Sequence, residues 1–272
     1  MTSCPDSTEP IPTVVGPEPT LPAKVRVEGV SKWFRVDGAI LQVLDGVSLE
    51  ARTGQFVSVI GPSGSGKTTL FNIVCGLMRP DAGQVAVDGG PGRPLRGAVA
   101  YMPQKDLLMP WRTVLENVLL GAEVAGQFLA EARREALELV PEFGLEGFER
   151  RYPHELSGGM RQRAALLRTY LLHRDVLLLD EPFGALDALT RRKLQLWLMS
   201  VWEEHRKTIL FITHDVDEAV FLSDRVFALT PRPARVACSV AVDLPRPRSA
   251  QTLFLPHFDE LRANLLHALD VL

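Results

Sequence analysis

The amino-acid sequence predicts an α/β fold with a mainly parallel core sheet, an antiparallel β subdomain and an inserted helical subdomain. Short apolar strand patterns alternate with helical patterns in residues 24–104 and again in 175–230, which is typical of α/β layer structures. Between these two parts, residues 105–174 carry helical patterns without a convincing strand. The chain of 272 residues has room for about two domains, or for one domain with a large insertion.

The composition describes a globular chain rather than a disordered or collagen-like one, with 46% hydrophobic and 23% charged residues. The formal charge of −3 does not favour nucleic acid as a partner, so any anion site must be local. The longest apolar stretches, such as 176–179 and 209–212, are far shorter than the ~20 residues that cross a bilayer. Cys4, Cys75 and Cys238 are too scattered for a disulfide framework or a zinc site, so we expect a reduced, cytoplasmic environment.

The N-terminal part is expected to pass from a tail into antiparallel strands. Residues 1–23 are rich in Pro, Thr, Ser and Glu, and we expect a disordered tail because proline removes helical donors. A strand pattern begins near Lys24, and further short strands are predicted at 41–44 and 47–51. Their short connections indicate antiparallel pairing.

The core is expected to start at the apolar run 56–60, which is followed by a tight loop and a helix over 67–77. Residues 231–272 are expected to form a C-terminal extension. The other predicted strands are 84–87, 98–102, 176–180, 208–213, 225–229 and 236–242, and the other predicted helices are 113–126, 130–143, 158–172 and 258–272.

A phosphate-binding motif lies between the strand at 56–60 and its helix. Residues 61–68 read GPSGSGKT and fit G-x-x-x-x-G-K-[ST] in this strand-to-helix context. Backbone N–H groups and the helix N-terminus would bind phosphate oxygens, Lys67 would reach the β- and γ-phosphates, and Thr68 could bind Mg²⁺. The alternative is a glycine-rich turn with an incidental lysine. The candidate loop residues are Gly61, Pro62, Ser63, Gly64, Ser65, Gly66, Lys67, Thr68 and Thr69.

Charged side chains end two other apolar strands. Asp180 ends the run 176–180 and Glu181 follows it. Burying a charged carboxylate at a strand end is costly unless it binds a metal or takes part in proton chemistry. Asp180 would hold Mg²⁺ and Glu181 would polarise an attacking water, whereas solvated acids at a strand end are the alternative. His214 follows the run 208–213, so it is expected to face the same crevice, unless it is an ordinary surface or core histidine.

A second glycine-rich helix start lies at Ser157, Gly158 and Gly159. A serine followed by two glycines at a helix N-terminus also suits phosphate, although a plain helix cap would look the same. Since one nucleotide has one set of phosphates, a second such start suggests a site that another copy of the chain completes.

With these motifs, the chain resembles the ATP-binding subunit of the ABC transporters from Lys24 to about Thr230, which implies a P-loop NTPase core. The family's phosphate loop, signature, metal strand and catalytic glutamate are matched by 61–69, 156–160, 176–180 and Glu181. The resemblance implies four further site residues. These are Phe34 stacked on adenine (with Trp33 as the neighbouring alternative), Gln104 beside Mg²⁺ and the membrane partner, Asp187 in a loop that crosses the dimer, and His214 as the switch histidine.

The resemblance also implies a mechanism. Two copies would pack head to tail, and the Lys67 loop of one and the 157–159 helix start of the other would enclose each ATP. Lys67 and Mg²⁺ would take up charge, Glu181 would orient or deprotonate water, and His214 would contact the γ-phosphate. The expected reaction is hydrolysis of ATP to ADP and phosphate, coupled to transport.

The segment Leu107–Trp111, with 182–187 and 213–219, is similar to the subgroup that energises importers of nitrate, sulfonates, taurine and thiamine precursors. The implied partners are transmembrane permease subunits and, indirectly, a solute-binding protein, at the cytoplasmic face of the cell membrane. We expect Leu107–Trp111 to form a partly exposed groove for a partner helix, with helical-subdomain core as the alternative.

Two other functional classes are alternatives for this sequence. A soluble ABC-type ATPase without a transporter is disfavoured by the importer-like segment 107–111 and by the single cassette. A P-loop GTPase or small-molecule kinase would not explain 156–160, and none of Asn72, Asn117 and Asn264 begins the N-K-x-D guanine motif.

Overall fold

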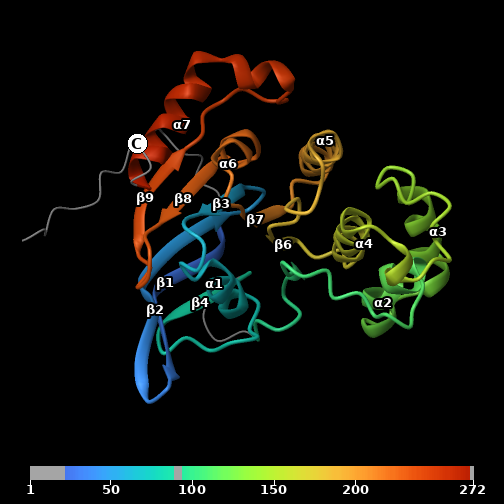
Figure 1. The fold of residues 1–272 in the computed structure, drawn as a ribbon, viewed down its shortest axis with the longest axis horizontal. Helices are drawn as coiled ribbons and strands as arrows, with labels where there is room; N and C mark the ends of the chain where they lie inside the picture. The colour runs from blue at the N-terminus through green and yellow to red at the C-terminus, as the bar shows by residue number, and fades with distance from the viewer. Residues whose placement is uncertain (1–21, 89–93, 270–272) are drawn as a thin grey trace, which may run out of the picture.

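The computed structural model describes residues 22–88 and 94–269, in which two β-sheets and the surrounding helices form the fold (Figure 1). The larger described sheet has the strand order β5-β6-β7-β3-β8-β9. Its strands are β3 (Phe56–Ile60), β5 (Ala100–Met102), β6 (Val176–Asp180), β7 (Thr208–Ile212), β8 (Arg225–Leu229) and β9 (Val236–Ala241). Neighbours run parallel except β9, which is antiparallel to β8. The mainly parallel core sheet is therefore confirmed, and β9 adds part of the expected C-terminal extension to its edge.

Both faces of this sheet are covered by apolar side chains. Strands β3, β6 and β7 are buried at every position. Phe56 and Ile60 join an apolar cluster with the helices on one face, whereas Val57 and Val59 join a second cluster with the smaller sheet. Continuous apolar strands are what a parallel sheet covered on both faces requires, so the core fixes where the strands end.

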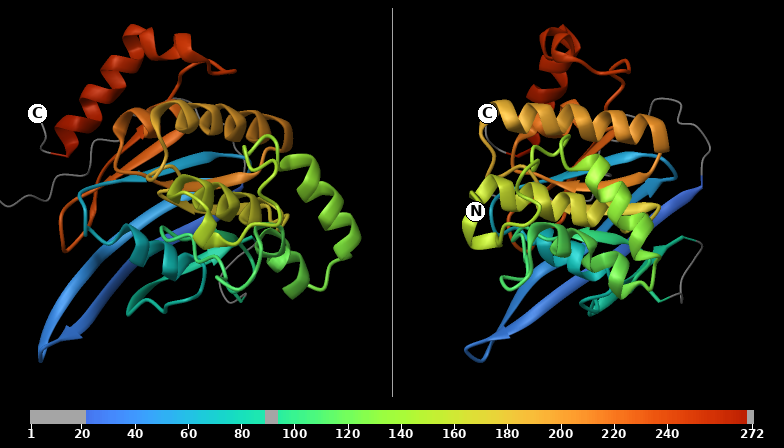
Figure 2. Two further views of the ribbon diagram at one scale, coloured as in Figure 1. Left: turned by 45° about the vertical axis from the view of Figure 1, so that its right-hand side comes forward. Right: turned by 90° about the vertical axis from the view of Figure 1, so that its right-hand side faces the viewer.

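The smaller sheet is antiparallel and has the order β2-β1-β4, with β1 at Ala23–Val36, β2 at Ala39–Arg52 and β4 at Ala82–Val87. The separate strands predicted at 41–44 and 47–51 are one strand, because the break between them is a β-bulge: the pairing of β1 with β2 shifts between Val30 and Lys32, and Gly46 has a left-handed φ of 63°. The β1–β2 hairpin projects from the rest of the molecule (Figure 2).

The expected disordered tail lies, up to residue 21, outside the described residues. Ala23 already pairs with Arg52 at the start of β1. Ordered structure thus begins slightly earlier than the composition of the tail indicates.

Helices cover the larger sheet and extend beyond one side of it. They are α1 (Lys67–Val74), α2 (Val114–Val124), α3 (Leu129–Leu139), α4 (Gly158–Tyr170), α5 (Ala188–His205), α6 (Val216–Leu222) and α7 (Pro256–Ala268), with 3₁₀ turns at Pro153–Glu155 and Ala250–Phe254. Helix α1 ends before Leu77 because Gly76 takes a left-handed φ of 74°. Helix α3 ends before Phe143, close to Pro141, which has no N–H to continue the helix.

The segment 105–174 holds α2, α3 and α4, which lie at the far side of the molecule from β9 and α7 (Figures 1 and 2). Thr113 caps α2 in a reciprocal pair with Glu116. At the other side, the buried Arg248 donates to the carbonyls of Val220 and Phe221 at the end of α6, which holds the C-terminal segment on the core. Within the described residues, no helix combines the length and apolar character needed to cross a membrane.

Candidate nucleotide site

Strand β3 leads directly into the phosphate loop, and glycines at both ends of the loop are required by its path. Gly61 has a φ of 155°, and a Cβ there would lie 2.9 Å from the Leu229 carbonyl oxygen. Gly66, the residue before α1, has a φ of 112°, and a Cβ there would lie 2.7 Å from Val43 Cγ1. Any larger residue at either position would displace the loop from the strands behind it.

Lys67 is folded back into this loop. Its ammonium donates to the carbonyl oxygens of Gly61 at 2.8 Å and Pro62 at 2.9 Å, and the residue is only 6% exposed. Burial lowers the pKa of Lys67, while the nearby carboxylates of Glu181 and Asp180 oppose that shift. The loop therefore holds a desolvated cation beside its backbone N–H groups, which is an arrangement that binds phosphate.

Asp180 and Thr68 form a site that suits a divalent cation. The Thr68 hydroxyl donates to Asp180 Oδ2 at 2.8 Å, while the buried Oδ1 accepts no hydrogen bond from the described residues. Burial raises the pKa of Asp180 to about 6. An unpaired buried carboxylate oxygen beside a hydroxyl is costly unless a cation binds there, and both are oxygen ligands that Mg²⁺ prefers.

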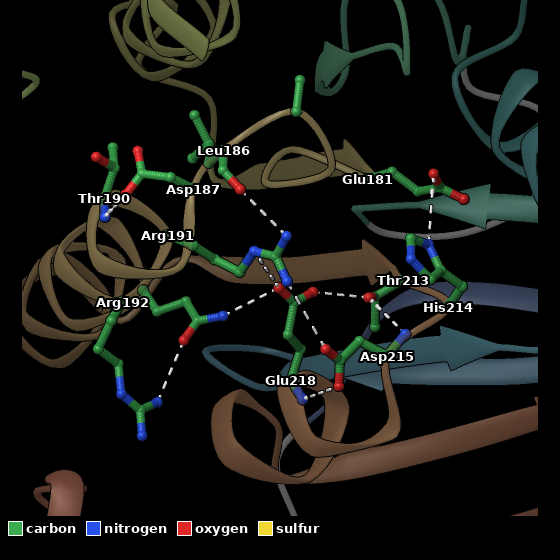
Figure 3. Close-up of polar contacts among 12 residues, drawn as sticks. Glu181, Leu186, Asp187, Thr190, Arg191, Arg192, Thr213, His214, Asp215 and Glu218 are labelled. Atoms are coloured by element: carbon green, nitrogen blue, oxygen red, sulfur yellow. Dashed lines mark hydrogen bonds and ion pairs between the residues drawn. The ribbon is translucent and has the colours of Figure 1, made fainter.

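Three residues that follow neighbouring strands of the larger sheet meet at Glu181. Gln104 Nε2 donates to Glu181 Oε2 at 3.0 Å. His214 Nδ1 lies 3.6 Å from the same oxygen, and Figure 3 shows this contact. Glu181 itself has a left-handed φ of 50°, a strained conformation for a residue with a side chain. Glu181 and His214 therefore meet at one edge of the sheet, as expected from parallel strands.

A cavity of about 460 Å³ joins the phosphate loop to the β1–β2 hairpin. Phe34 lines it, whereas the backbone N–H of Trp33 donates to Asp81 at 2.9 Å and the Trp33 side chain is absent from the lining. Of the two adjacent aromatic residues, Phe34 is therefore the one that lines this cavity. The other lining residues include Ser63, Gly64, Gly66, Lys67, Thr68, Thr69, Gln104, Glu181 and Arg232.

Ser157 and Asp187 lie outside this cavity, and each caps a helix instead. Ser157 is exposed, and its hydroxyl accepts from the N–H of Met160 at 3.3 Å at the start of α4. Asp187 Oδ1 accepts from the N–H groups of Leu189 and Thr190 at the start of α5. Gly158 and Gly159 are half-buried next to Ser157. One copy of the chain thus assembles the phosphate loop, Gln104, Asp180, Glu181 and His214, but not the second helix start.

Two residues near the site were not identified from the sequence. The Arg232 guanidinium, from the turn between β8 and β9, donates to the Gly64 carbonyl and lines the cavity. The sequence signal was the turn motif Pro-Arg-Pro at 231–233. Gln162 of α4 accepts from the N–H of Ala185 at 2.9 Å, a long-range contact that no local pattern predicts.

Comparison with known proteins places the chain among ATP-binding cassettes. A family model described as ABC transporter matches residues 44–184. The chain is 46% identical over 250 residues to an uncharacterised ABC transporter ATP-binding protein of Methanocaldococcus jannaschii, covering 90% of this chain and 91% of that protein. It is 39% identical over 246 residues to an aliphatic sulfonates import ATP-binding protein of Bacillus cereus, covering 90% and 96%. It is also similar to a solved dimeric ATP-binding cassette in a post-hydrolysis state bound to ADP and Pi, with a TM-score of 0.73, 32% identity, and coverage of 80% of this chain and 98% of that chain.

Proposed function

The chain belongs to the ABC transporter family of ATP-binding proteins and is an ATPase, and from this premise we propose that it energises an importer of a small solute. The observation that carries this proposal is the position of Gln104. It lines the nucleotide cavity, where it donates to Glu181, and it also lines a second, largely apolar cavity of about 900 Å³. A single side chain thus joins the hydrolytic site to a surface suited to a partner.

Within the nucleotide site, we propose a role for each residue. Lys67 and the loop N–H groups bind the β- and γ-phosphates, Phe34 stacks on adenine, and Glu181 orients or deprotonates the attacking water. His214, 3.6 Å from Glu181, contacts the γ-phosphate. Thr68 and Asp180 would hold Mg²⁺, which supplies positive charge to the phosphates. The described residues contain no group of three or more His, Cys, Asp or Glu side chains suited to a metal, so water and phosphate oxygens would complete the Mg²⁺ shell.

The second helix start supports a two-copy site. Ser157 is exposed and does not line the cavity of its own chain, while a solved cassette similar to this chain is dimeric. We infer that a second copy, packed head to tail, places Ser157, Gly158 and Gly159 over the γ-phosphate, and that Asp187 lies at the junction of the two copies.

The larger cavity supports a membrane partner. Leu107 and Met109 line it, and Leu107 is 57% exposed, whereas Leu108 between them is 8% exposed and packs in the core. This short segment therefore has residues that line the cavity, as the predicted groove requires, and a residue that packs in the core, as the alternative requires. We propose that a cytoplasmic helix of a transmembrane permease occupies this groove, which places the chain at the cytoplasmic face of the cell membrane.

The proposed solute class is supported only by relatives and by the resemblance in the sequence. The relative in Bacillus cereus is described as an importer subunit for aliphatic sulfonates. We propose a small solute of the nitrate, sulfonate, taurine or thiamine-precursor type, delivered to the permease by a solute-binding protein.

Site-specific photocrosslinking tests the importer assignment. A photoreactive residue replacing Leu107 should crosslink in cells to a polytopic membrane protein, because Leu107 lines the groove. A matched residue replacing Phe254, which is 84% exposed in the C-terminal segment, should not give this product. Crosslinks from Leu107 to soluble proteins alone would instead support an ABC-type ATPase that is not coupled to transport.

A further inference from the structure

A polar network joins the start of α5 to the segment that carries His214 (Figure 3). At its centre is Arg191, whose guanidinium donates to the Leu186 carbonyl oxygen at 3.2 Å. The same guanidinium lies 3.8 Å from Glu218 and 4.0 Å from Asp215. One side chain thus contacts the loop before α5 and lies near two carboxylates of the segment that follows His214, Asp215 and Glu218.

The far end of the network controls the backbone around His214. Glu218 accepts from the Thr213 hydroxyl at 2.7 Å, and that hydroxyl accepts from the N–H of Asp215 at 3.0 Å. Asp215 in turn accepts from the N–H of Glu218 at 3.1 Å. Since Thr213 and Asp215 flank His214, a displacement of Glu218 would move the imidazole.

The part of the network around Glu218 is buried, and it has a second link to α5. Gln195, one turn beyond Arg191, donates to Glu218 at 3.0 Å, and Glu218 and Gln195 are 8% and 4% exposed. Such contacts are strong in a desolvated setting and costly to leave unmade. The start of α5 and the His214 segment are therefore expected to move together.

One contact in this network is incomplete. Arg191 Nε is buried and makes no hydrogen bond within the described part of the chain, although it faces Glu218 Oε1 at 3.8 Å. A displacement of about 1 Å would bring this pair to ordinary hydrogen-bond length. The single copy thus holds an unused donor and a buried carboxylate that a small shift of α5 would join.

We propose that Arg191 is a positioning residue that couples the loop 185–187 to His214. The proposal rests on the two-copy site described above, in which Asp187 lies at the junction. Contact with the second copy shifts the start of α5, Arg191 completes its hydrogen bond to Glu218, and Thr213 and Asp215 then hold His214 in its catalytic position. Hydrolysis would thus depend on closure of the dimer and not on ATP binding alone.

Arg191→Gln and Glu218→Gln test this coupling, with Lys193→Ala as the matched control because Lys193 is exposed on the same helix. We expect either network variant to lower kcat about tenfold, with little change in KM for ATP or in single-chain ATP binding. The double variant should lose no more activity than either single variant, because each single variant already removes the interaction between Arg191 and Glu218. Lys193→Ala should retain the original turnover.

Two further measurements separate coupling from simple destabilisation. Arg191→Lys, which keeps the charge but not the forked guanidinium, should recover part of kcat at an unchanged thermal midpoint. In a Glu181→Gln background, Arg191→Gln should still form the ATP-dependent dimer. Unaltered kcat in Arg191→Gln, or additive losses in the double variant, would overturn the coupling. A failure of Glu181→Gln with native Arg191 to dimerise would instead overturn the two-copy site itself.

Discussion

The two glycine-rich helix starts of this molecule differ in what their N–H groups already bind. Before α1, Gly66 has no side chain to cap the helix, and the buried Lys67 lies beside the open N–H groups. Before α4, the Ser157 hydroxyl occupies the N–H of Met160, and the serine is exposed to solvent. In the proposed function, the first start binds phosphate within its own chain, while the second would gain a ligand only when another molecule presents one.

The largest effect should come from the chemistry beside α1. Glu181→Gln is expected to lower kcat about a hundredfold or more, because the amide cannot take a proton from water. Both helix starts remain intact, so the variant should bind ATP and accumulate a nucleotide-bound dimer by light scattering. Glu138→Gln, on the exposed face of α3, is the control and should turn over normally. Full activity in Glu181→Gln would remove Glu181 from its role.

Changing the second helix start should separate binding from closure. Ser157→Arg places a bulky cation where the second copy approaches, so we expect single-chain ATP binding to be nearly intact while ATP-dependent dimerisation and turnover are lost. Equilibrium nucleotide binding and light scattering measure the two effects. An unimpaired ATP-dependent dimer would show that both starts do not enclose one nucleotide.

The acid beside α1 should make stability depend on pH. The pKa of Asp180 is about 6 in the folded chain against an ordinary value of 3.8, so its protonated form stabilises the fold, and that contribution is lost as pH rises from about 4 through 6. Between pH 4 and pH 7 this ionisation should lower the free energy of unfolding of the original chain by about 2 to 3 kcal/mol, and Asp180→Asn should not show this decrease. At pH 7, without nucleotide or Mg²⁺, Asp180→Asn should therefore be more stable than the original chain. Denaturant unfolding at pH 4 and pH 7 measures it, with Asp37→Asn in an exposed turn as the control. If the stability of Asp180→Asn depended on pH as strongly as that of the original chain, the effect of burial on Asp180 would be contradicted.

The smallest effect should come from the cap of α4. Ser157→Ala removes the hydrogen bond to the Met160 N–H and is expected to cost about 1 kcal/mol in the free energy of unfolding. Gly66→Ala should cost more, because a Cβ there meets Val43 at 2.7 Å in a left-handed backbone. Thermal unfolding measures both variants. Equal losses of stability in Ser157→Ala and Gly66→Ala would contradict the difference between the two helix starts.

The features that could be predicted from the sequence are those with a local signature. The phosphate loop follows from the glycine and lysine spacing at 61–68, and the core strands follow from continuous apolar runs such as 176–179. The bulge at Gly46 could not be distinguished from a turn, because both interrupt an alternating pattern in the same way. Arg232 and Arg191 gain their roles from contacts with distant segments, and no spacing rule encodes such contacts.

The central claim is that each ATP site combines the α1 start of one copy with the α4 start of another. A mixing experiment tests it most directly. Chains carrying Lys67→Ala and chains carrying Ser157→Arg should each be inactive alone, because each spoils one half of every site. Mixed one to one, they should recover turnover, up to about half of the original, since only the mixed dimer closes and it holds one intact site of two. A mixture as inactive as its components would contradict the shared site.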